Sequence, residues 1–278
     1  MPELPEVETI RVELEPLLAG RRIRGASLDR NDIVGWPAPA GFLSGVRGRL
    51  IESLDRRGKY LIVRLDRGKD LVFHLRLSGH LEVVSASEKP RFERARLVLD
   101  NDQALSFVEP RVLGRVYLAD AGAYPARLGG MARMGCEPIE RGFTAGYLQD
   151  KLAGRKAAVK SLLLDQRVCC GVGNIYSDEA LFRAGVRPTR AAGRLTALEV
   201  GRLASALRRV LADGIRWCGT TLGDGRYLRP GTQQGSFQRR LKVFGRAGER
   251  CRRRGCRGTV VRTRVGNRSS YYCPECQH

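Results

Sequence analysis

Four cysteines near the C-terminus place the strongest constraint on the fold. Cys251, Cys256, Cys273 and Cys276 follow the pattern C-x4-C-x16-C-x2-C within the final 28 residues. Two closely spaced pairs of thiolates suit tetrahedral zinc, and in an intracellular chain such pairs favour a metal site over disulfides. We therefore expect one structural Zn2+ with four thiolate ligands and no open position for catalysis. Two disulfides or four unrelated thiols are the alternatives.

The 16 residues between the two cysteine pairs suit a β-hairpin. Segments 260–265 and 269–273 would form its arms, around a turn at Gly266 and Asn267. Arg268 would then lie near the tip of the hairpin, where a bound metal sets its direction. The other four cysteines, at positions 136, 169, 170 and 218, have no partner at ligand spacing and are expected in the core.

The charge balance indicates a polyanionic partner. The chain has 50 Lys and Arg against 29 Asp and Glu, a formal net charge of +21, which favours nucleic acid. An apolar content of 42% suffices for ordinary cores and excludes a disordered basic tail. No run of 18 apolar residues exists, and the chain opens with acids where a secretory signal needs basic and then apolar residues. We expect a soluble, intracellular monomer without membrane contact.

The periodicity of apolar residues changes along the chain and predicts its domains. Residues 5–15 have helical spacing, whereas residues 22–118 form short alternating segments typical of antiparallel strands in a sandwich or barrel. Helical spacing returns at 144–153, 156–165, 174–184 and 196–213. The predicted organisation is a β-sandwich domain at 1–122, a linker at 123–142, a helical domain at 143–240 with a long loop at 219–236, and a zinc finger at 241–278.

Four sequence blocks carry a resemblance to a known family. They are MPELPEVET at 1–9, RGKY at 57–60, LLDQ at 163–166 with GVGNIYSDE at 171–179, and the terminal cysteine segment with Arg268. In this order they resemble bacterial formamidopyrimidine-DNA glycosylases over essentially the whole chain, although that family normally has C-x2-C where this chain has C-x4-C. Leu4 favours this branch over the related endonuclease VIII branch, which usually begins with PEGPE. The implied fold is an α+β multidomain one: an N-terminal antiparallel β-sandwich with an N-terminal helix, then a helix–two-turn–helix domain and a β-hairpin zinc finger.

Pro2 and Glu3 have the chemistry of a nucleophile and its proton shuttle. Removal of Met1 would expose the secondary amine of Pro2, and an α-amino group with a pKa of about 7.7–8 is partly neutral near pH 7. Attack on a sugar C1′ gives an iminium that cannot lose a nitrogen proton and acts as an electron sink. Glu3 can move protons to the ring oxygen or the amine. Glu6 would orient or hydrate the site or contact the lesion. The alternative for both acids is a favourable interaction with the helix dipole.

Three side chains are expected to hold the DNA strand. The resemblance implies that Lys59 contacts the phosphates beside the lesion, and Asn174 begins a helix whose backbone N–H groups suit phosphate. Arg268 offers a fork of donors for two phosphate oxygens. The resemblance also implies catalytic and proton-transfer roles for Lys59 and Arg268. A solvated lysine and a plain helix N-cap are the alternatives for Lys59 and Asn174.

Three residues match those with which the family fills the space left by an extruded base. Leu77 lies where Met is usual, Arg111 matches an Arg that suits the acceptors of an orphaned cytosine, and Leu113 lies where Phe is usual. Leu77 and Leu113 could instead be core residues. The loop at 219–236 matches the family's lid over the flipped base, and its candidate contacts are Thr220, Thr221, Asp224, Arg226 and Tyr227.

The resemblance implies a bifunctional DNA glycosylase and abasic-site lyase of base excision repair. Its substrates would be 8-oxoguanine and formamidopyrimidines in double-stranded DNA, with strand cleavage by β,δ-elimination, in the bacterial cytoplasm at the nucleoid. A glycosylase of the same fold that prefers oxidised pyrimidines is one alternative. A non-catalytic zinc protein that binds damaged DNA is another, and only Pro2, Glu3 and Lys59 argue for an enzyme over a binder.

Overall fold

The computed structural model describes residues 2–124, 128, 130–223 and 227–278. Its contacts divide the chain into two compact units, Met1–Arg133 with Trp217–Gln238 and Met134–Arg216 with Arg239–His278. The loop at 219–236, expected within the helical domain, therefore groups with the N-terminal unit. Hydrogen bonds between this loop and the first residues of the chain account for the difference.

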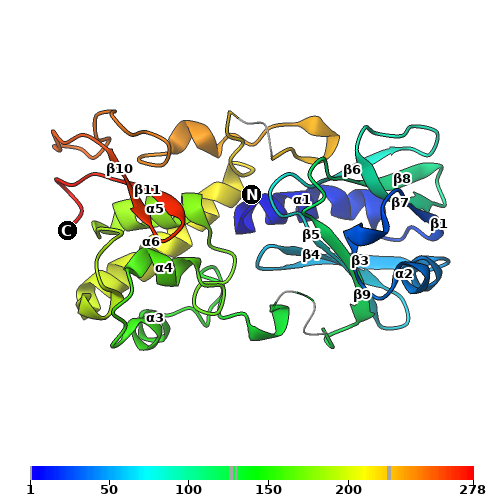
Figure 1. Cartoon of the computed structure of the whole chain (residues 1–278), viewed down its shortest axis with the longest axis horizontal. Coiled ribbons are helices and arrows are strands. Elements are labelled where there is room, and N and C mark those ends of the chain that lie inside the picture. Colours follow the sequence, from blue (N-terminus) through cyan, green and yellow to red (C-terminus); the bar gives the residue numbers. More distant parts are fainter. Residues whose placement is uncertain (1, 125–127, 129, 224–226) are drawn as a thin grey trace. The chain divides into compact units, whose positions relative to one another are not determined.

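The N-terminal unit is the predicted sandwich of two sheets (Figure 1). One sheet has the strand order β1–β7–β8–β6 and the other β2–β9–β5–β4–β3. The bounds are β1 Ile23–Leu28, β2 Val34–Trp36, β3 Ile51–Arg57, β4 Tyr60–Leu65, β5 Lys69–His74, β6 His80–Ser85, β7 Glu93–Leu99, β8 Gln103–Val108 and β9 Arg115–Asp120.

Strand direction departs from the prediction at one position. The described pairs of the two sheets are antiparallel, except that β2 runs parallel to β9. Tight turns dictate antiparallel pairing between consecutive strands, as in the pairs β3–β4, β4–β5 and β7–β8. β2 and β9 are separated by most of the sandwich in sequence, so no local turn sets their relative direction.

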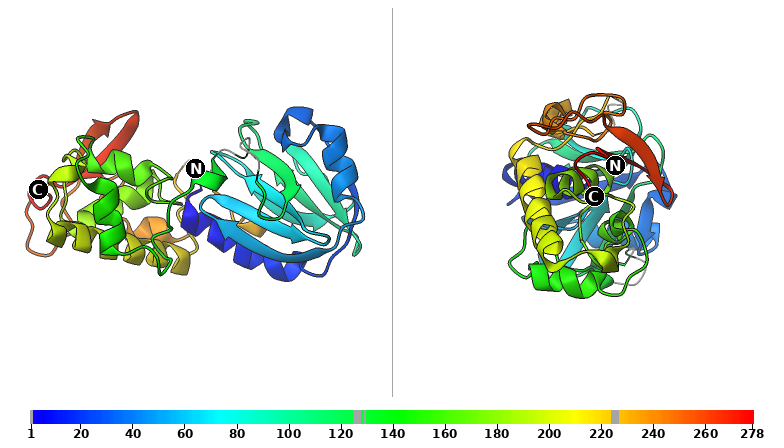
Figure 2. Two further views of the ribbon diagram at one scale, coloured as in Figure 1. Left: turned by 90° about the horizontal axis from the view of Figure 1, so that it is seen from below. Right: turned by 90° about the vertical axis from the view of Figure 1, so that its left-hand side faces the viewer.

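Two helices close the open edges of the sandwich (Figures 1 and 2). α1 (Leu4–Leu18) packs on the edge strands β3 and β6, and α2 (Pro39–Val46) packs on the edge strands β1 and β2. α1 extends the helix predicted at 5–15. The sequence does not predict α2, because its glycines weaken the helical pattern. Gly45 is needed there, since a Cβ would lie 2.5 Å from Leu118 Cδ2.

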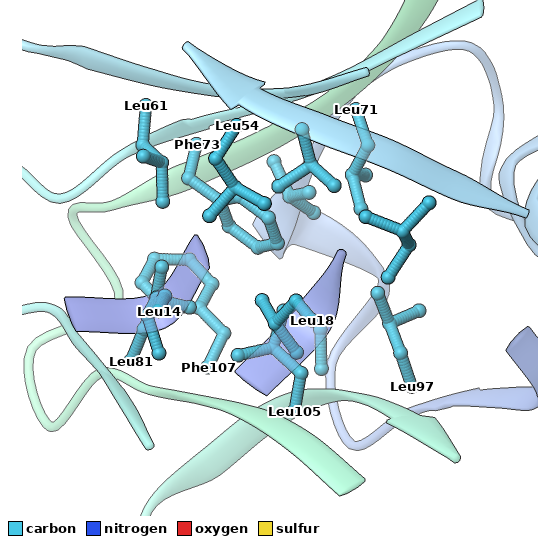
Figure 3. Close-up of a cluster of buried hydrophobic side chains, with 14 of the residues drawn as sticks. Leu14, Leu18, Leu54, Leu61, Leu71, Phe73, Leu81, Leu97, Leu105 and Phe107 are labelled. Atoms are coloured by element: carbon cyan, nitrogen blue, oxygen red, sulfur yellow. The ribbon is translucent and has the colours of Figure 1, made fainter. Parts of the chain in front are cut away.

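The core of this unit lies between the sheets (Figure 3). Its side chains come from α1, from β3, β4 and β5 on one side, and from β6, β7 and β8 on the other. The labelled members point toward one another: Leu14, Leu18, Leu54, Leu61, Leu71, Phe73, Leu81, Leu97, Leu105 and Phe107. The alternation of apolar residues along each strand therefore gives one shared apolar layer.

The second unit contains the four predicted helices and the predicted hairpin. The bounds are α3 Ala145–Leu152, α4 Val159–Leu164, α5 Asn174–Ala184, α6 Ala197–Arg216, β10 Val261–Val265 and β11 Arg268–Tyr272. α5 packs on both α6 and β11. Short 3-10 turns occur at Asn31–Ile33, Met131–Arg133, Ala192–Arg194, Pro230–Thr232 and Phe237–Arg240. Across the described part of the chain, no helix combines the length and apolar character needed to cross a membrane.

Candidate active site and metal centre

The first residues of the chain are held inside the N-terminal unit. Glu3 is the N-cap of α1, and Pro5 occupies the first turn, where a missing N–H costs nothing. Pro2 and Glu3 are both buried. The backbone N–H of Glu3 donates to Glu6 Oε2 at 2.8 Å. The two residues predicted as nucleophile and proton shuttle are thus adjacent, sheltered from water and tied to the helix that follows them.

Glu6 joins the start of α1 to the loop 217–238. Its carboxylate is 2% exposed, and Oε1 accepts a hydrogen bond from the backbone N–H of Thr220 at 2.8 Å. The preceding Gly219 has φ +75°, and a Cβ there would lie 2.8 Å from Glu6 Cγ. Glycine is therefore required by both backbone conformation and space. This interaction could not be read from the sequence, because the two residues lie 214 positions apart in the chain.

The lid candidates within the described residues are buried. Thr221 Oγ1 donates to Tyr227 O at 2.9 Å and accepts from Gly235 N at 2.9 Å. The Tyr227 ring belongs to the apolar core, and its hydroxyl donates to Cys218 O at 3.2 Å. Arg226 and Asp224 lie outside the described residues. The described parts of the loop are thus folded against α1, and Tyr227 has a packing role in this structure.

Lys59 follows the turn of the β3–β4 hairpin, which an ion pair ties to α1. Arg56 Nε donates to Glu8 Oε2 at 2.9 Å, and Arg56 Nη1 donates to Gly58 O at 3.2 Å. Lys59 is 7% exposed, so the alternative of a solvated turn lysine is wrong.

His74 is buried beside Lys59 and stays neutral. Burial lowers the pKa of His74 to about 3, and the charges of Arg76 and Lys59 act in the same direction. Its Nδ1 accepts from Arg76 N at 3.1 Å, and its ring meets the Tyr60 ring edge-on at 4.4 Å. A histidine in this state packs and accepts a hydrogen bond, and it cannot act as a general acid near neutral pH.

The three void-filling candidates lie on two loops of the N-terminal unit. Leu77 is half-buried between β5 and β6, whereas Arg111 and Leu113 are exposed between β8 and β9. Leu113 is 41% exposed, so its alternative assignment to the core is wrong. A buried carboxylate that sequence reasoning missed, Glu109, accepts hydrogen bonds from both loops.

In the second unit, Asn174 is the first residue of α5, and Gly173 is the N-cap. The alternative of a plain N-cap for Asn174 is therefore wrong. Gln166 holds the preceding turn: its Nε2 donates to Leu164 O at 3.0 Å and Val172 O at 2.9 Å, and its Oε1 accepts from Gly171 N at 2.9 Å. One side chain thus joins the LLDQ and GVGN blocks. Asn174 Oδ1 is buried and accepts no hydrogen bond from the described residues.

The four terminal cysteines converge. Their sulfur atoms all lie within 4.8 Å of one another, with Cys251 and Cys276 at 3.8 Å and Cys256 and Cys273 at 3.7 Å. A disulfide would need about 2.05 Å, and all four are free thiols. The cluster can hold a metal ion, and the C-x4-C spacing does not prevent its assembly.

Arg268 begins β11 and is exposed beside the turn at Gly266 and Asn267. The strand that it begins is bound to the helices of its unit. Asp178 accepts from Ser270 Oγ at 2.7 Å and from Tyr271 N at 3.0 Å, and pairs with Lys160 Nζ at 2.7 Å. These contacts are buried and link Arg268's strand to α5, the helix that begins with Asn174.

Two family models match the chain. The model of the formamidopyrimidine-DNA glycosylase N-terminal domain matches residues 1–116, and that of the formamidopyrimidine-DNA glycosylase H2TH domain matches residues 134–224. A curated relative, the formamidopyrimidine-DNA glycosylase of Desulfitobacterium hafniense, is 39% identical over 283 residues, a match that covers 100% of each chain. That of Pelotomaculum thermopropionicum is 40% identical over 278 residues, covering 100% of this chain and 99% of the relative.

Solved structures of the same kind superpose closely. The MutM (Fpg) protein of Thermus thermophilus gives a TM-score of 0.89 at 39% identity, covering 99% of this chain and 98% of that one. Lactococcus lactis Fpg in complex with DNA containing Fapy-dG gives 0.89 at 27% identity, covering 99% and 100%. The same protein with DNA containing an oxidised pyrimidine gives 0.90 at 28% identity, covering 100% of both.

Glu6→Gln is expected to loosen the loop 217–238. The amide has one oxygen where the carboxylate has two, so either Glu3 N–H or Thr220 N–H loses its acceptor, at a cost of about 1–3 kcal/mol in the free energy of unfolding. Hydrogen exchange should show faster exchange in the loop. The matched control is Glu13→Gln, which removes a partly exposed ion pair with Arg229 on the same loop and should cost about 0–1 kcal/mol. A larger effect from the control would contradict this role of Glu6.

Burial of His74 predicts a pH dependence of stability. The unfolded chain binds a proton on His74 below its ordinary pKa of 6.5, and the folded chain does not until about pH 3. Stability should therefore fall as pH drops below 6.5, by up to about 1.4 kcal/mol per pH unit for this group. His74→Asn keeps an acceptor and removes the titration. Urea unfolding at pH 7.5, 6.5 and 5.5 should give a smaller slope for the variant, and equal slopes would refute the argument.

Proposed function

The chain belongs to the formamidopyrimidine-DNA glycosylase family, and on that premise we propose that it excises oxidised purines from DNA in base excision repair and then cleaves the strand as a lyase. The observation that carries the proposal is the buried N-terminal pair Pro2 and Glu3 in a chain whose similarity to these enzymes is full-length. The structure of a relative with DNA containing Fapy-dG supports an oxidised purine as substrate.

Pro2 is the nucleophile of the proposed reaction. Once Met1 is removed, the lone pair of the Pro2 nitrogen forms a bond to C1′ of the damaged nucleotide. The bond between C1′ and the base breaks, and the base leaves with a proton from a general acid. The sugar ring opens to give an iminium on the Pro2 nitrogen. This iminium acidifies C2′, so loss of a C2′ proton expels the 3′-phosphate, and a second elimination expels the 5′-phosphate.

Glu3 supplies and receives protons in this sequence. It is adjacent to Pro2, and its burial holds it near the amine and the ring oxygen of an attached sugar. Lys59, also buried in the N-terminal unit, contributes a positive charge toward the phosphates beside the lesion. Arg268 serves both as a phosphate ligand and as a proton donor, as the family resemblance implies.

The remaining assignments concern the DNA itself. Asn174 and Arg268 bind phosphates in this proposal, through the N–H donors at the start of α5 and through the exposed guanidinium beside the hairpin turn. Leu77, Arg111 and Leu113 fill the space left by the extruded base. The segment with Thr220, Thr221 and Tyr227 covers that base, oriented through Glu6. The protein acts as a monomer on DNA in the bacterial cytoplasm.

The metal of the cysteine cluster is zinc in this proposal. A tetrahedral ion with metal–sulfur bonds of about 2.3 Å requires sulfurs about 3.8 Å apart. The sulfur pairs at 3.7 and 3.8 Å fit this requirement. With four thiolates it would hold the hairpin in place and supply no chemistry to the reaction.

Borohydride trapping tests the nucleophile. The Met-processed protein should form a covalent adduct with a duplex that contains 8-oxoguanine opposite cytosine. The same chain extended at its N-terminus should form none, because the Pro2 nitrogen is then an amide with no nucleophilic lone pair. A chain extended after His278 is the matched control and should retain the adduct. Full strand cleavage by the N-terminally extended chain would exclude this mechanism.

Zinc analysis tests the metal. Elemental analysis of the purified protein should find one zinc per chain. Cys273→Ser should reduce that content and weaken binding to an abasic-site duplex by on the order of tenfold, because the hairpin that carries Arg268 loses its support. Cys136→Ser, outside the cluster, should keep both properties. Unchanged zinc content in Cys273→Ser would disprove the assignment of the ligands.

A preference for oxidised pyrimidines is the second candidate function. It is favoured by one observation, the relative's structure with DNA that contains an oxidised pyrimidine. A panel of duplexes with 8-oxoguanine, a formamidopyrimidine or an oxidised pyrimidine separates the two. Faster excision of the purine lesions supports the first proposal, and the reverse order supports the second. Binding without a trapped adduct on all of them would indicate a non-catalytic damage-binding protein.

A further inference from the structure

One buried carboxylate connects the two loops that carry the void-filling candidates. Glu109 follows β8 and is 0% exposed. Its Oε1 accepts from Ser78 Oγ at 2.5 Å and from the backbone N–H of Arg111 at 3.0 Å, and its Oε2 accepts from Gly114 N at 2.9 Å. Ser78 follows Leu77 directly in the sequence, and the other two donors, the N–H groups of Arg111 and Gly114, lie on either side of Leu113.

The backbone of Glu109 adds a third loop to this junction. Its N–H donates to Phe92 O at 3.0 Å, and its carbonyl accepts from Arg94 Nε at 3.1 Å. Residues of the loops 75–79 and 109–114, together with Phe92 and Arg94, thus meet at Glu109. We call this set of hydrogen bonds the Glu109 junction.

Close packing leaves the junction little freedom. A Cβ on Gly79 would lie 2.7 Å from Leu75 O and 2.9 Å from the Phe107 ring. A Cβ on Gly114 would lie 2.6 Å from the Phe107 ring and 2.9 Å from Glu109 Oε2. Both contacts are shorter than side chains tolerate, so the loops can approach the carboxylate this closely only with glycine at these positions.

Three non-glycine residues in the loops that meet at Glu109 have a strained backbone conformation. Arg76 has φ 56° and precedes Leu77, Val112 has φ 54° and precedes Leu113, and Phe92 itself has φ 66°. Residues other than glycine rarely adopt this left-handed region, and they keep it only where surrounding contacts impose it. Hydrogen bonds of the Glu109 junction flank all three positions, and the N–H of Arg76 itself also donates to His74 Nδ1.

We propose that Glu109 is a positioning residue that sets Leu77, Arg111 and Leu113 in the arrangement in which they enter the duplex together. This inference rests on the proposed function. Leu77 is shorter than the Met usual at its position, and Leu113 is smaller than the usual Phe and offers no aromatic stacking. Their contribution to DNA binding therefore depends more on being held in place before DNA binds. Loops that become ordered only on binding lose conformational entropy, and this loss weakens the affinity for DNA.

Glu109→Gln tests the proposal with three DNA substrates. The amide keeps the shape but places an N–H2 against one of the three donors. Single-turnover excision of 8-oxoguanine opposite cytosine should fall by about tenfold, the effect of one lost charge-assisted hydrogen bond. The preference for cytosine over adenine opposite the lesion should fall toward one. Cleavage at an abasic site in single-stranded DNA, which leaves no void to fill, should stay within about twofold.

Glu93→Gln is the matched control. Glu93 is also buried, at 5% exposed, and accepts from Ser106 Oγ and from Arg96 Nη1 at 2.7 Å, but these partners lie in strands. The control should retain the wild-type opposite-base preference even if its melting temperature falls. An equal loss of preference in Glu93→Gln would overturn the proposal. So would an equal loss of single-strand and duplex activity in Glu109→Gln.

Ser78→Ala keeps the proposal testable if Glu109→Gln does not fold. It removes only the link to the Leu77 loop and should give a smaller loss of preference, which Ser78→Thr should restore. An unchanged preference in Ser78→Ala would count against the junction. If the wild-type protein itself forms no adduct with 8-oxoguanine DNA, the proposed function fails, and this result is distinct from any outcome of the variants.

Discussion

Burial of one face of α1 is the interaction on which the N-terminal unit depends. Leu4, Val7, Ile10, Leu14 and Leu18 are each 0% exposed, and each contributes on the order of 1.5–3 kcal/mol relative to an exposed position. The helix closes the edge between the two sheets, so the same contacts bury the helix and close the sandwich. Pro2 lies two residues before the helix begins. The apolar face that stabilises the fold therefore also determines where a nucleophilic amine is held.

Buried carboxylates hold the loops in place by hydrogen bonds, whereas apolar packing holds the sheets together. Glu6, Glu109 and Glu179 are each at most 4% exposed, and they accept from backbone N–H groups of loops at Thr220, at Arg111 and Gly114, and at 242–244. A buried charge is tolerated because several donors surround it. The net charge of +21 already includes these acids, so they orient the loops while the chain keeps the positive field that attracts DNA.

The sequence predicts the structural features that have a local cause. The 3.6-residue period predicts α3 to α6, alternation predicts a strand-rich region at 22–118, and cysteine spacing predicts the metal cluster. The missed features have distant causes. The parallel pairing of β2 with β9, the Thr220–Glu6 hydrogen bond and the joining of three loops by Glu109 each link segments without a shared local pattern. The sequence shows each of these residues, including Glu109, but it does not show which distant residue forms the hydrogen bond or strand pair with it.

The C-x4-C spacing shows how the fold accommodates a departure from the family pattern. The longer connection carries Arg253, whose guanidinium lies 4.9 Å from the centre of the Phe182 ring and donates to the Phe182 carbonyl at the end of α5. Asp178, on the same helix, binds Ser270 and Tyr271 of β11. Both sides of the metal cluster are therefore attached to α5. The direction of Arg268 then depends on that helix, which begins with Asn174, more than on the number of residues between two cysteines.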